Sequence, residues 1–232
     1  MTDVHAHLLP DIDDGPKHME TTIAMIKALV ELGYKKLIAT PHVYWDYYPN
    51  TKRDILERLL EVQREVEKAG LAVTIDAAAE YFLEEHFVSL VKKREVLTLD
   101  RTDYVLVECS LLQNNLNLRD YLFEAQVHGY RPVLAHPERY LYFKESDYAA
   151  LLELGCSFQL NLMSLAGHYG YDVKRRAQFL LKKNWISFLG TDAHHLKHID
   201  ILRKTVASRK IRRLLGNYSF QNDTFSNVRF MT

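Results

Sequence analysis

A regular alternation of helices and short β-type runs is the feature that most constrains this fold. One helix is clear because apolar residues recur four, three and four positions apart before Gly33, namely Met19, Ile23, Ile26 and Val30. Residues 55–66 repeat this spacing before Gly70, and residues 118–125 form a shorter apolar face before Gly129. Further helices are predicted at 85–94, 146–154, 172–183 and 198–215.

The runs between these helices have the apolar and β-branched character of strands buried on both faces. They lie at 2–6, 36–39, 72–77, 104–107, 131–135, 156–160 and 186–189. Such alternation predicts an α/β fold with parallel strands and right-handed crossovers, as an open sheet or a closed barrel. A chain of 232 residues with 47% hydrophobic composition and no linker is expected to form a single domain over 1–232.

Potential metal ligands stand at the carboxyl ends of six of the seven predicted strands. Asn161 follows the remaining one, the sixth. Parallel strands bring these ends to one rim, where the active sites of such folds lie. In chain order the candidate residues are His5 and His7, His42, Glu80, Glu108, His136, and Asp192 with His194. This shared position predicts one metal site more strongly than any single residue does.

Two pairs of candidates have the spacing that one ion requires. His5 and His7 are two residues apart on one strand, so both imidazoles point to the same face, and Asp192 with His194 repeats the pattern. The pair Asp13 and Asp14 before Gly15 is compatible with a solvated turn or with a ligand, and the nearby histidines favour the ligand. Of the remaining histidines, His195 abuts the site. The others are expected on surfaces or helices, and they are His18, His86, His128, His168 and His198.

Charge and hydropathy exclude several classes of function. The 30 Lys and Arg balance 30 Asp and Glu, so no electrostatic footprint for nucleic acid is present. No apolar stretch reaches the length of about 20 residues that spans a membrane, and we expect a cytoplasmic protein.

Other catalytic motifs do not fit the sequence. A thiol phosphatase needs an Arg six residues after its Cys, but Asn115 and Leu162 stand there after Cys109 and Cys156. Serine-hydrolase and nucleotide-triphosphatase loops are also absent from the sequence.

Seven short motifs together resemble the polymerase and histidinol phosphatase (PHP) superfamily. They are D-V-H-A-H (3–7), D-D-G (13–15), T-P-H (40–42), A-E (79–80), V-E (107–108), A-H-P-E-R-Y (135–140) and T-D-A-H (191–194). Within it, the chain looks like the bacterial manganese-dependent protein-tyrosine phosphatases encoded with capsule and exopolysaccharide genes. The match runs from residue 3 to about 215. It implies a distorted, TIM-like (β/α)7 barrel with metals at the carboxyl rim.

The resemblance also implies a ligand set for three divalent transition-metal ions. The first ion would be held by His5, His7, Glu80 and Asp192. The second would be held by Glu80, Glu108 and His136, and the third by Asp14, His42 and His194. Glu80 would bridge two ions, and Glu80 with Asp192 would act in catalysis. Imidazole and carboxylate donors suit Mn, Fe or Zn, and manganese is implied by the resemblance alone.

The same resemblance implies hydrolysis of phosphotyrosine by a metal-activated hydroxide. The expected partner is a phosphotyrosine protein, a tyrosine autokinase of polysaccharide synthesis or export. Arg139 presents a planar fork and is predicted to bind phosphate during catalysis, with a structural salt bridge to Glu138 or another carboxylate as the alternative. Family members carry a second phosphate-binding Arg after the last motif, but His195 to Ile199 contain none. Lys197, His195 or Arg203 are candidate substitutes.

Tyr44 begins an aromatic cluster after His42 that is compatible with a wall against a phenyl ring or with a cap on the barrel.

Three other functions remain open. A PHP phosphatase for a small ester such as histidinol phosphate would share every ligand. An amidohydrolase would need a carboxylated Lys where Glu108 stands. A non-catalytic PHP interaction module would be expected to lose ligands, and none of the nine is missing.

Overall fold

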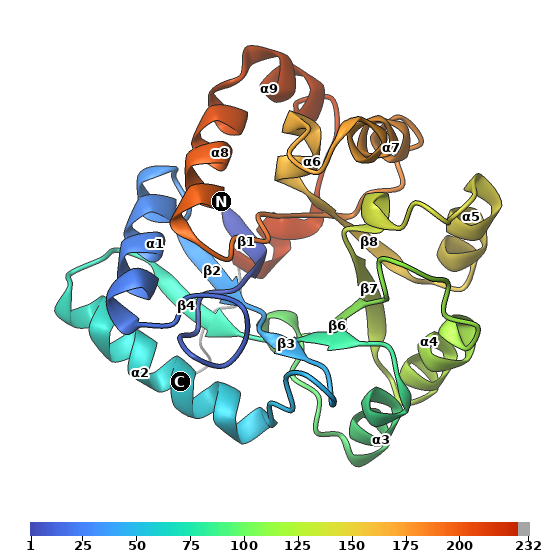
Figure 1. Ribbon diagram of the computed structural model, residues 1–232, viewed down its shortest axis with the longest axis horizontal. Helices are drawn as coiled ribbons and strands as arrows, with labels where there is room; N and C mark the ends of the chain where they lie inside the picture. The colour runs from blue at the N-terminus through green and yellow to red at the C-terminus, as the bar shows by residue number, and fades with distance from the viewer. Residues whose placement is uncertain (227–232) are drawn as a thin grey trace.

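Parallel strands form the centre of the molecule, and helices surround them (Figure 1). The computed structural model describes residues 1–226. A three-stranded sheet has the order β1 (Thr2–Ala6), β2 (Lys36–Ala39), β4 (Thr74–Ala77). A six-stranded sheet has the order β3 (His42–Val43), β5 (Glu80–Phe82), β6 (Tyr104–Glu108), β7 (Arg131–Ala135), β8 (Ser157–Asn161), β9 (Phe188–Gly190).

Two short strands that were outside the predicted bounds, β3 and β5, continue the predicted runs 36–39 and 72–77, each after a break of two residues. Thr40 and Pro41 separate β2 from β3, and proline has no N–H to continue a ladder. Ala78 and Ala79 separate β4 from β5. Pairing nevertheless continues across both breaks, because Ala78 N donates to Ala39 O at 2.8 Å and Glu80 N donates to Pro41 O at 3.0 Å. The nine strands therefore occupy the seven positions that the sequence predicts.

The first and last positions also meet. Asp192 N donates to His5 O at 2.8 Å and His7 N donates to Ala193 O at 3.0 Å, just beyond β9. The carboxylate of Asp3 on β1 strengthens this seam, since it accepts hydrogen bonds from Thr191 Oγ1 at 2.6 Å and from Thr191 N at 3.0 Å. These contacts agree with the predicted seven-position barrel.

The helices lie where apolar spacing predicts them, with two differences. The matching helices are α1 (Met19–Glu31), α2 (Lys52–Lys68), α3 (Glu85–Lys93), α4 (Leu118–Val127), α5 (Glu145–Glu153) and α7 (Tyr171–Lys182). The predicted helix at 198–215 is wrong as one element. Ser208 is extended and separates α8 (Leu196–Ala207) from α9 (Arg209–Leu215), which its hydroxyl caps by accepting from Ile211 N. Helix α6 (Leu162–Ala166) was not predicted.

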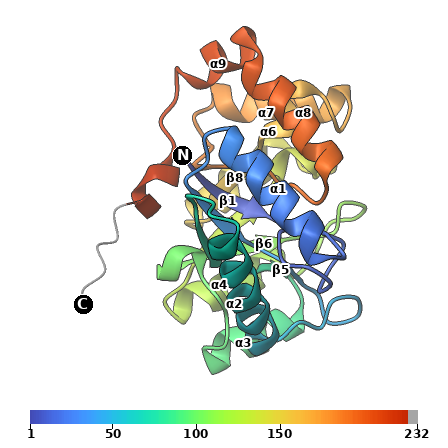
Figure 2. The ribbon, with the colours of Figure 1, turned by 90° about the vertical axis from the view of Figure 1, so that its left-hand side faces the viewer.

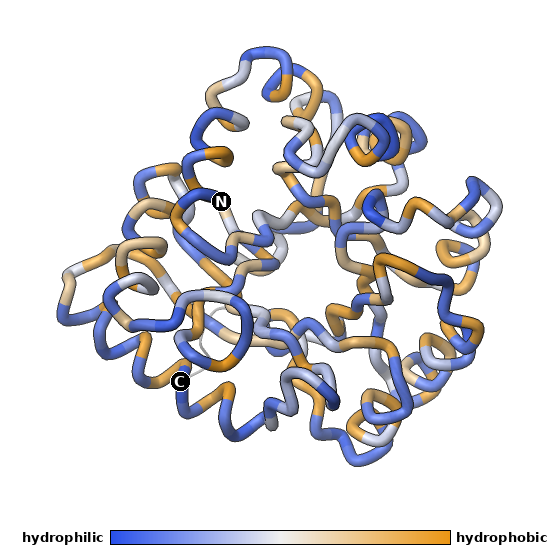
Figure 3. Tube along the Cα trace, viewed as in Figure 1, coloured by the Kyte–Doolittle hydropathy of each residue, from blue (hydrophilic) through white to orange (hydrophobic). Residues whose placement is uncertain are grey.

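Alternation along the strands separates two apolar clusters. Side chains on one face of each strand pack outward against the helices, whose apolar sides are turned to the strands in Figure 3. Side chains on the other face form an inner cluster that includes Val4, Ile38, Leu106, Val133 and Phe188. Among residues 1–226, no helix is long and apolar enough to cross a membrane.

A C-terminal segment, η3 (Gln221–Ser226), covers the amino end of the barrel, opposite the loops that follow the strands (Figure 2). Phe225 is 2% exposed and stacks on Phe188 with ring centroids 5.6 Å apart. The amide of Asn222 donates to Thr2 O at 3.0 Å and to Leu189 O at 2.7 Å, and accepts from Leu189 N at 2.9 Å. The short motifs named in the sequence analysis all end before this segment.

Replacing Phe225 by Ala should destabilise the fold without changing the chemistry. Loss of a fully buried Phe side chain costs about 3–5 kcal/mol in free energy of unfolding, and the site lies at the other end of the barrel. Phe123→Ala, at a 59% exposed phenylalanine of α4, is the matched control and should cost less than about 1 kcal/mol. Denaturant unfolding measures both. Equal midpoints for the two variants would contradict this role of η3.

Candidate metal centre

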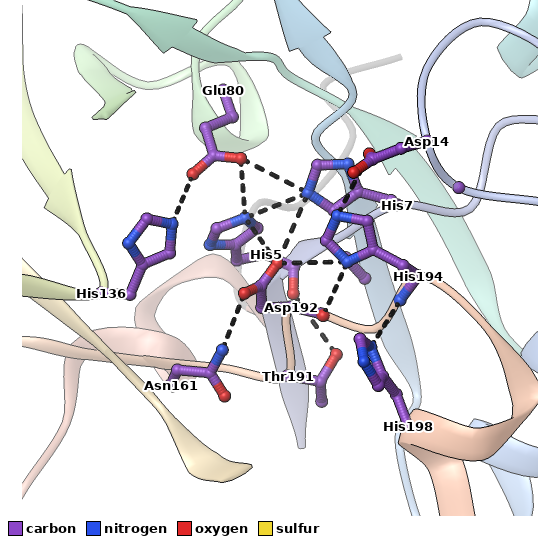
Figure 4. Close-up of polar contacts among 12 residues, drawn as sticks. His5, His7, Asp14, Glu80, His136, Asn161, Thr191, Asp192, His194 and His198 are labelled. Carbon is purple, nitrogen blue, oxygen red and sulfur yellow. Dashed lines mark hydrogen bonds and ion pairs between the residues drawn. The ribbon is translucent and has the colours of Figure 1, made fainter. Parts of the chain in front are cut away.

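The nine predicted ligands converge at the carboxyl ends of the strands (Figure 4). The side chains of His5, His7 and Glu80 are fully buried. Those of His42 and His194 are 15% and 14% exposed. Strand geometry explains the convergence. His5 and His7 stand on and directly after β1, and Asp14 lies in the segment that follows it. His42 opens β3, Glu80 opens β5 and Glu108 ends β6, while His136, Asp192 and His194 lie just beyond β7 and β9.

Glu80 lies at the middle of the cluster. Its Oε2 atom is 3.2 Å from both His5 Nε2 and His42 Nδ1 and 3.4 Å from His7 Nε2, but it accepts no hydrogen bond. Ligands bound to one ion at about 2.0–2.2 Å are separated from each other by about 3.0–3.4 Å. Three nitrogens at this spacing around an unpaired oxygen are therefore the arrangement that a shared cation requires.

The buried imidazoles are oriented by partners on their far sides. His5 Nδ1 is 2.7 Å from Gln159 Oε1, and His7 Nδ1 is 2.7 Å from Asp13 Oδ2. Because both oxygens act as acceptors, each Nδ1 carries the proton. The two Nε2 atoms then present lone pairs to each other at 3.3 Å, which a cation between them would stabilise. The donor set thus fits divalent transition metals.

Asp13 and Gln159 have roles that the sequence did not assign. Asp13 was a candidate turn residue or ligand, but it is buried and holds His7, and its Oδ2 also accepts from His42 N at 3.2 Å. Gln159 lies within the strand predicted at 156–160. A polar side chain inside a buried strand was the available signal, since it needs a hydrogen-bonding partner.

Three groups of donor atoms are close enough to share an ion. They are His5 with His7 and Glu80; His7 with Asp14, His42 and His194; and His42 with Glu80 and Glu108. Asp192 Oδ1 adjoins the first group, 3.5 Å from His5 Nε2 and 3.6 Å from His7 Nε2. The expected third partner of Glu80 and Glu108, His136, instead lies 3.0 Å from the other oxygen of Glu80.

The imidazoles and carboxylates stabilise each other's charged forms. Burial alone would lower the pKa of His42, but Glu80 and Glu108 raise it to about 9. Burial would raise the pKa of Asp14, but His194 and His42 hold it well below its usual range. Bound cations would take the place of protons on these imidazoles, so metal binding is coupled to proton release.

Arg139 lies beside the cluster and forms the alternative salt bridge with another carboxylate, Asp192, but not with Glu138. Its Nη1 atom is 3.2 Å from Asp192 Oδ2, and its guanidinium stacks over the ring of Tyr169 at 4.5 Å. Glu138 is buried and accepts hydrogen bonds from Ser164 Oγ at 2.6 Å and from Asn161 N at 3.0 Å. The side chain of Arg139 is 23% exposed, so it remains accessible to a substrate.

A pocket of about 690 Å³ opens over the cluster. Arg139, Tyr44 and His195 line it, and the ring of Tyr44 stacks on Phe82 at 4.1 Å. Lys197 is exposed and is not part of the lining, so its contact with substrate stays a prediction.

Arg203 is paired with Glu31 and Asp200 outside the pocket. His198 was assigned to a surface or helix. It lies on α8 but also lines the pocket, where its Nδ1 accepts from His194 N at 3.2 Å. Of the possible substitutes for a second phosphate-binding Arg that the sequence offered, only His195 reaches the pocket lining.

Comparison with known proteins identifies relatives over nearly the whole chain. Tyrosine-protein phosphatase YwqE of Bacillus subtilis (strain 168) is 31% identical over 199 residues, which are 85% of this chain and 78% of that protein. Tyrosine-protein phosphatase CpsB of Streptococcus pneumoniae is 26% identical over 229 residues, covering 92% of this chain and 94% of that protein.

The fold matches as well. A chain from crystal structures of YwqE from Bacillus subtilis and CpsB from Streptococcus pneumoniae, named as unique metal-dependent tyrosine phosphatases, has a TM-score of 0.80 at 28% identity and covers 95% of this chain and 96% of that chain. A histidinol phosphate phosphatase from Lactococcus lactis shares the fold at a TM-score of 0.53 and 14% identity, covering 94% of each chain. A family model for capsular polysaccharide synthesis, CpsB/CapC, matches residues 1–227. The chain belongs to the CpsB/CapC family.

Proposed function

We propose that this protein is a metal-dependent protein-tyrosine phosphatase, a phosphoric monoester hydrolase acting on phosphotyrosine. The observation that carries the proposal is the convergence of nine ligand-type side chains under one open pocket with Arg139 at its edge. The curated relatives are named tyrosine-protein phosphatases, and the family model covers almost the whole chain.

The proposed cofactors are three divalent transition-metal ions, with manganese favoured and iron or zinc compatible with the donors. Glu80 would hold two of these ions, and its position supports this because one oxygen faces His5, His7 and His42 while the other faces His136. The three sets of ligands would be His5, His7, Glu80 and Asp192; Glu80, Glu108 and His136; and Asp14, His42 and His194.

The chain's own residues position the ester and stabilise its charge. Bound cations would supply a water of lowered pKa and positive charge for phosphate oxygens. The guanidinium of Arg139 can donate two parallel hydrogen bonds to the phosphate, and the ring of Tyr169 packs against one face of the guanidinium. Tyr44, stacked on Phe82, offers a flat surface to the phenyl ring. A tyrosine leaving group with a pKa of about 10 departs with little help from a general acid.

The proposed partner is a phosphotyrosine protein in the cytoplasm, namely a tyrosine autokinase of polysaccharide synthesis or export. The family's description, capsular polysaccharide synthesis, supports this choice. The balanced charge of the chain supports a protein partner rather than nucleic acid.

Substrate comparison tests the function directly. After reconstitution with Mn, the protein should release phosphate from a phosphotyrosine peptide with a kcat/KM at least about tenfold above that for histidinol phosphate, since the aromatic surface at Tyr44 suits a phenyl ring. A malachite-green assay measures both rates. A preference for histidinol phosphate would support the small-ester alternative, and no release from either substrate would support a non-catalytic module.

Glu80→Gln tests the bridging ligand. Loss of one anionic bridging oxygen should lower kcat by at least about 100-fold, because metal catalysis contributes several kcal/mol. Elemental analysis after Mn reconstitution should find more than one ion per chain in the unmodified protein and fewer in the variant. Glu138→Gln changes an equally buried carboxyl that is no ligand and should retain the metal content. A Glu80→Gln protein with full metal content and turnover would remove Glu80 from the bridge.

Arg139→Lys tests the phosphate contact. The variant keeps the charge but loses the bidentate fork, so kcat/KM should fall by about 10- to 150-fold, equivalent to a charged hydrogen bond of about 1.5–3 kcal/mol. Inhibition by free phosphate should weaken, and the melting temperature should barely change. Arg203→Lys, at an arginine outside the pocket, is the control and should behave as the unmodified protein. A lower melting temperature with unchanged activity would instead make Arg139 structural.

A further inference from the structure

Strand order divides the rim of the metal pocket into two chemically different sectors. The donor sector follows β7, β8 and β9 and consists of Arg139, Tyr169, His195 and His198. The apolar sector follows β3, β5 and β6 and consists of Tyr44, Tyr47, Tyr48, Phe82, Leu111 and Leu112. Because β3, β5 and β6 are neighbours in one sheet, the segments that carry the apolar sector adjoin one another on the rim, where Ser110 and Gln113 also line the pocket.

Three members of the apolar sector are exposed, two of them strongly. Leu112 is 93% exposed, Tyr47 is 69% exposed and Leu111 is 39% exposed. A single exposed leucine is ordinary in a folded protein. A contiguous apolar group at the mouth of a polar pocket is different, because such groups mark surfaces that bind a partner.

The loop that carries Leu111 and Leu112 is held at its base. Cys109 N donates to Tyr140 Oη at 3.1 Å, and Tyr142 Oη donates to Ser110 O at 2.6 Å. Farther along, Asn115 Nδ2 donates to Leu83 O at 2.8 Å, which ties the loop to the end of β5. The loop therefore presents its leucines from anchored backbone.

We propose that Tyr47, Leu111 and Leu112 form a docking surface for the polypeptide that flanks a phosphotyrosine, with a preference for apolar flanking residues. The inference rests on the proposed function. A phosphate directed to the metal ligands and Arg139 places the tyrosine ring beside Tyr44. The peptide backbone at the far end of the ring then emerges at the rim.

The flanking polypeptide is the expected occupant because the docking surface is part of the lining of the metal pocket. The donor sector is matched to phosphate, so the apolar sector is the part of the rim left for the peptide. A small polar ester would end inside the pocket and would leave Leu112 in water. The docking surface therefore distinguishes a phosphorylated polypeptide from a free aryl phosphate.

Leu112→Ser and Leu116→Ser form a matched pair for the test. Both leucines are 93% exposed in the same loop, but only Leu112 lines the pocket. Three substrates are compared: phenyl phosphate, a phosphotyrosyl heptapeptide with leucine on both sides of the phosphotyrosine, and the same peptide with glutamate at those places. Steady-state rates are measured for the Mn-loaded full chain, and circular dichroism checks folding.

Leu112→Ser should lower the ratio of kcat/KM for the leucine peptide to that for phenyl phosphate by about tenfold, through KM, which corresponds to about 1.4 kcal/mol. Leu116→Ser should leave this ratio unchanged, and the glutamate peptide should show little response to Leu112→Ser. Equal ratios in the two variants, or an equal effect on both peptides, would overturn the docking surface. Failure of the unmodified protein on all three substrates would instead overturn the proposed function.

Discussion

The carboxylate of Glu80 is the group on which the architecture of the site depends. It is buried without a hydrogen bond to one of its oxygens, at a place where three imidazole nitrogens converge. A bare carboxylate in such surroundings is costly unless positive charge compensates it. The rest of the barrel supplies that compensation, because six of the seven strand positions contribute a potential ligand while Asp13 and Gln159 orient two of the rings. The fold therefore brings potential metal ligands to distances that suit either a shared cation or protonated imidazoles.

Much of this fold follows from periodicity in the sequence. The strands 2–6 and 131–135 have the predicted bounds, and six helices lie within a few residues of their predictions. The spacing of apolar residues indicates which side chains are buried, but not which groups form hydrogen bonds with each other. It therefore missed the short strands β3 and β5 and the break at Ser208, whose hydroxyl caps the next helix. The role of Gln159 and the packing of Phe225 depend on contacts with distant segments, which no local pattern contains.

The ligand positions were predictable for a different reason. Parallel strands share one direction, so residues at the same phase of successive strand–helix units meet at one rim. The substrate side was less predictable, because exposed loops are not constrained by that rule. Lys197 was expected near the substrate and lies outside the pocket lining, whereas His198 was expected elsewhere and lines it. The backbone turn at the start of α8 decides which of these side chains faces inward.

The seam between β1 and the residues after β9 has a consequence for biosynthesis. Asp3 and Thr191 meet across a sequence separation of 188 residues, and His5 and His7 reach Asp192 only when that seam forms. A ribosome at about 5–20 residues per second exposes the first two histidines many seconds before their carboxylate partner. During synthesis the nascent chain thus carries an incomplete set of ligands. The full set of potential ligands therefore exists only once the seam between the first and last strand positions has closed.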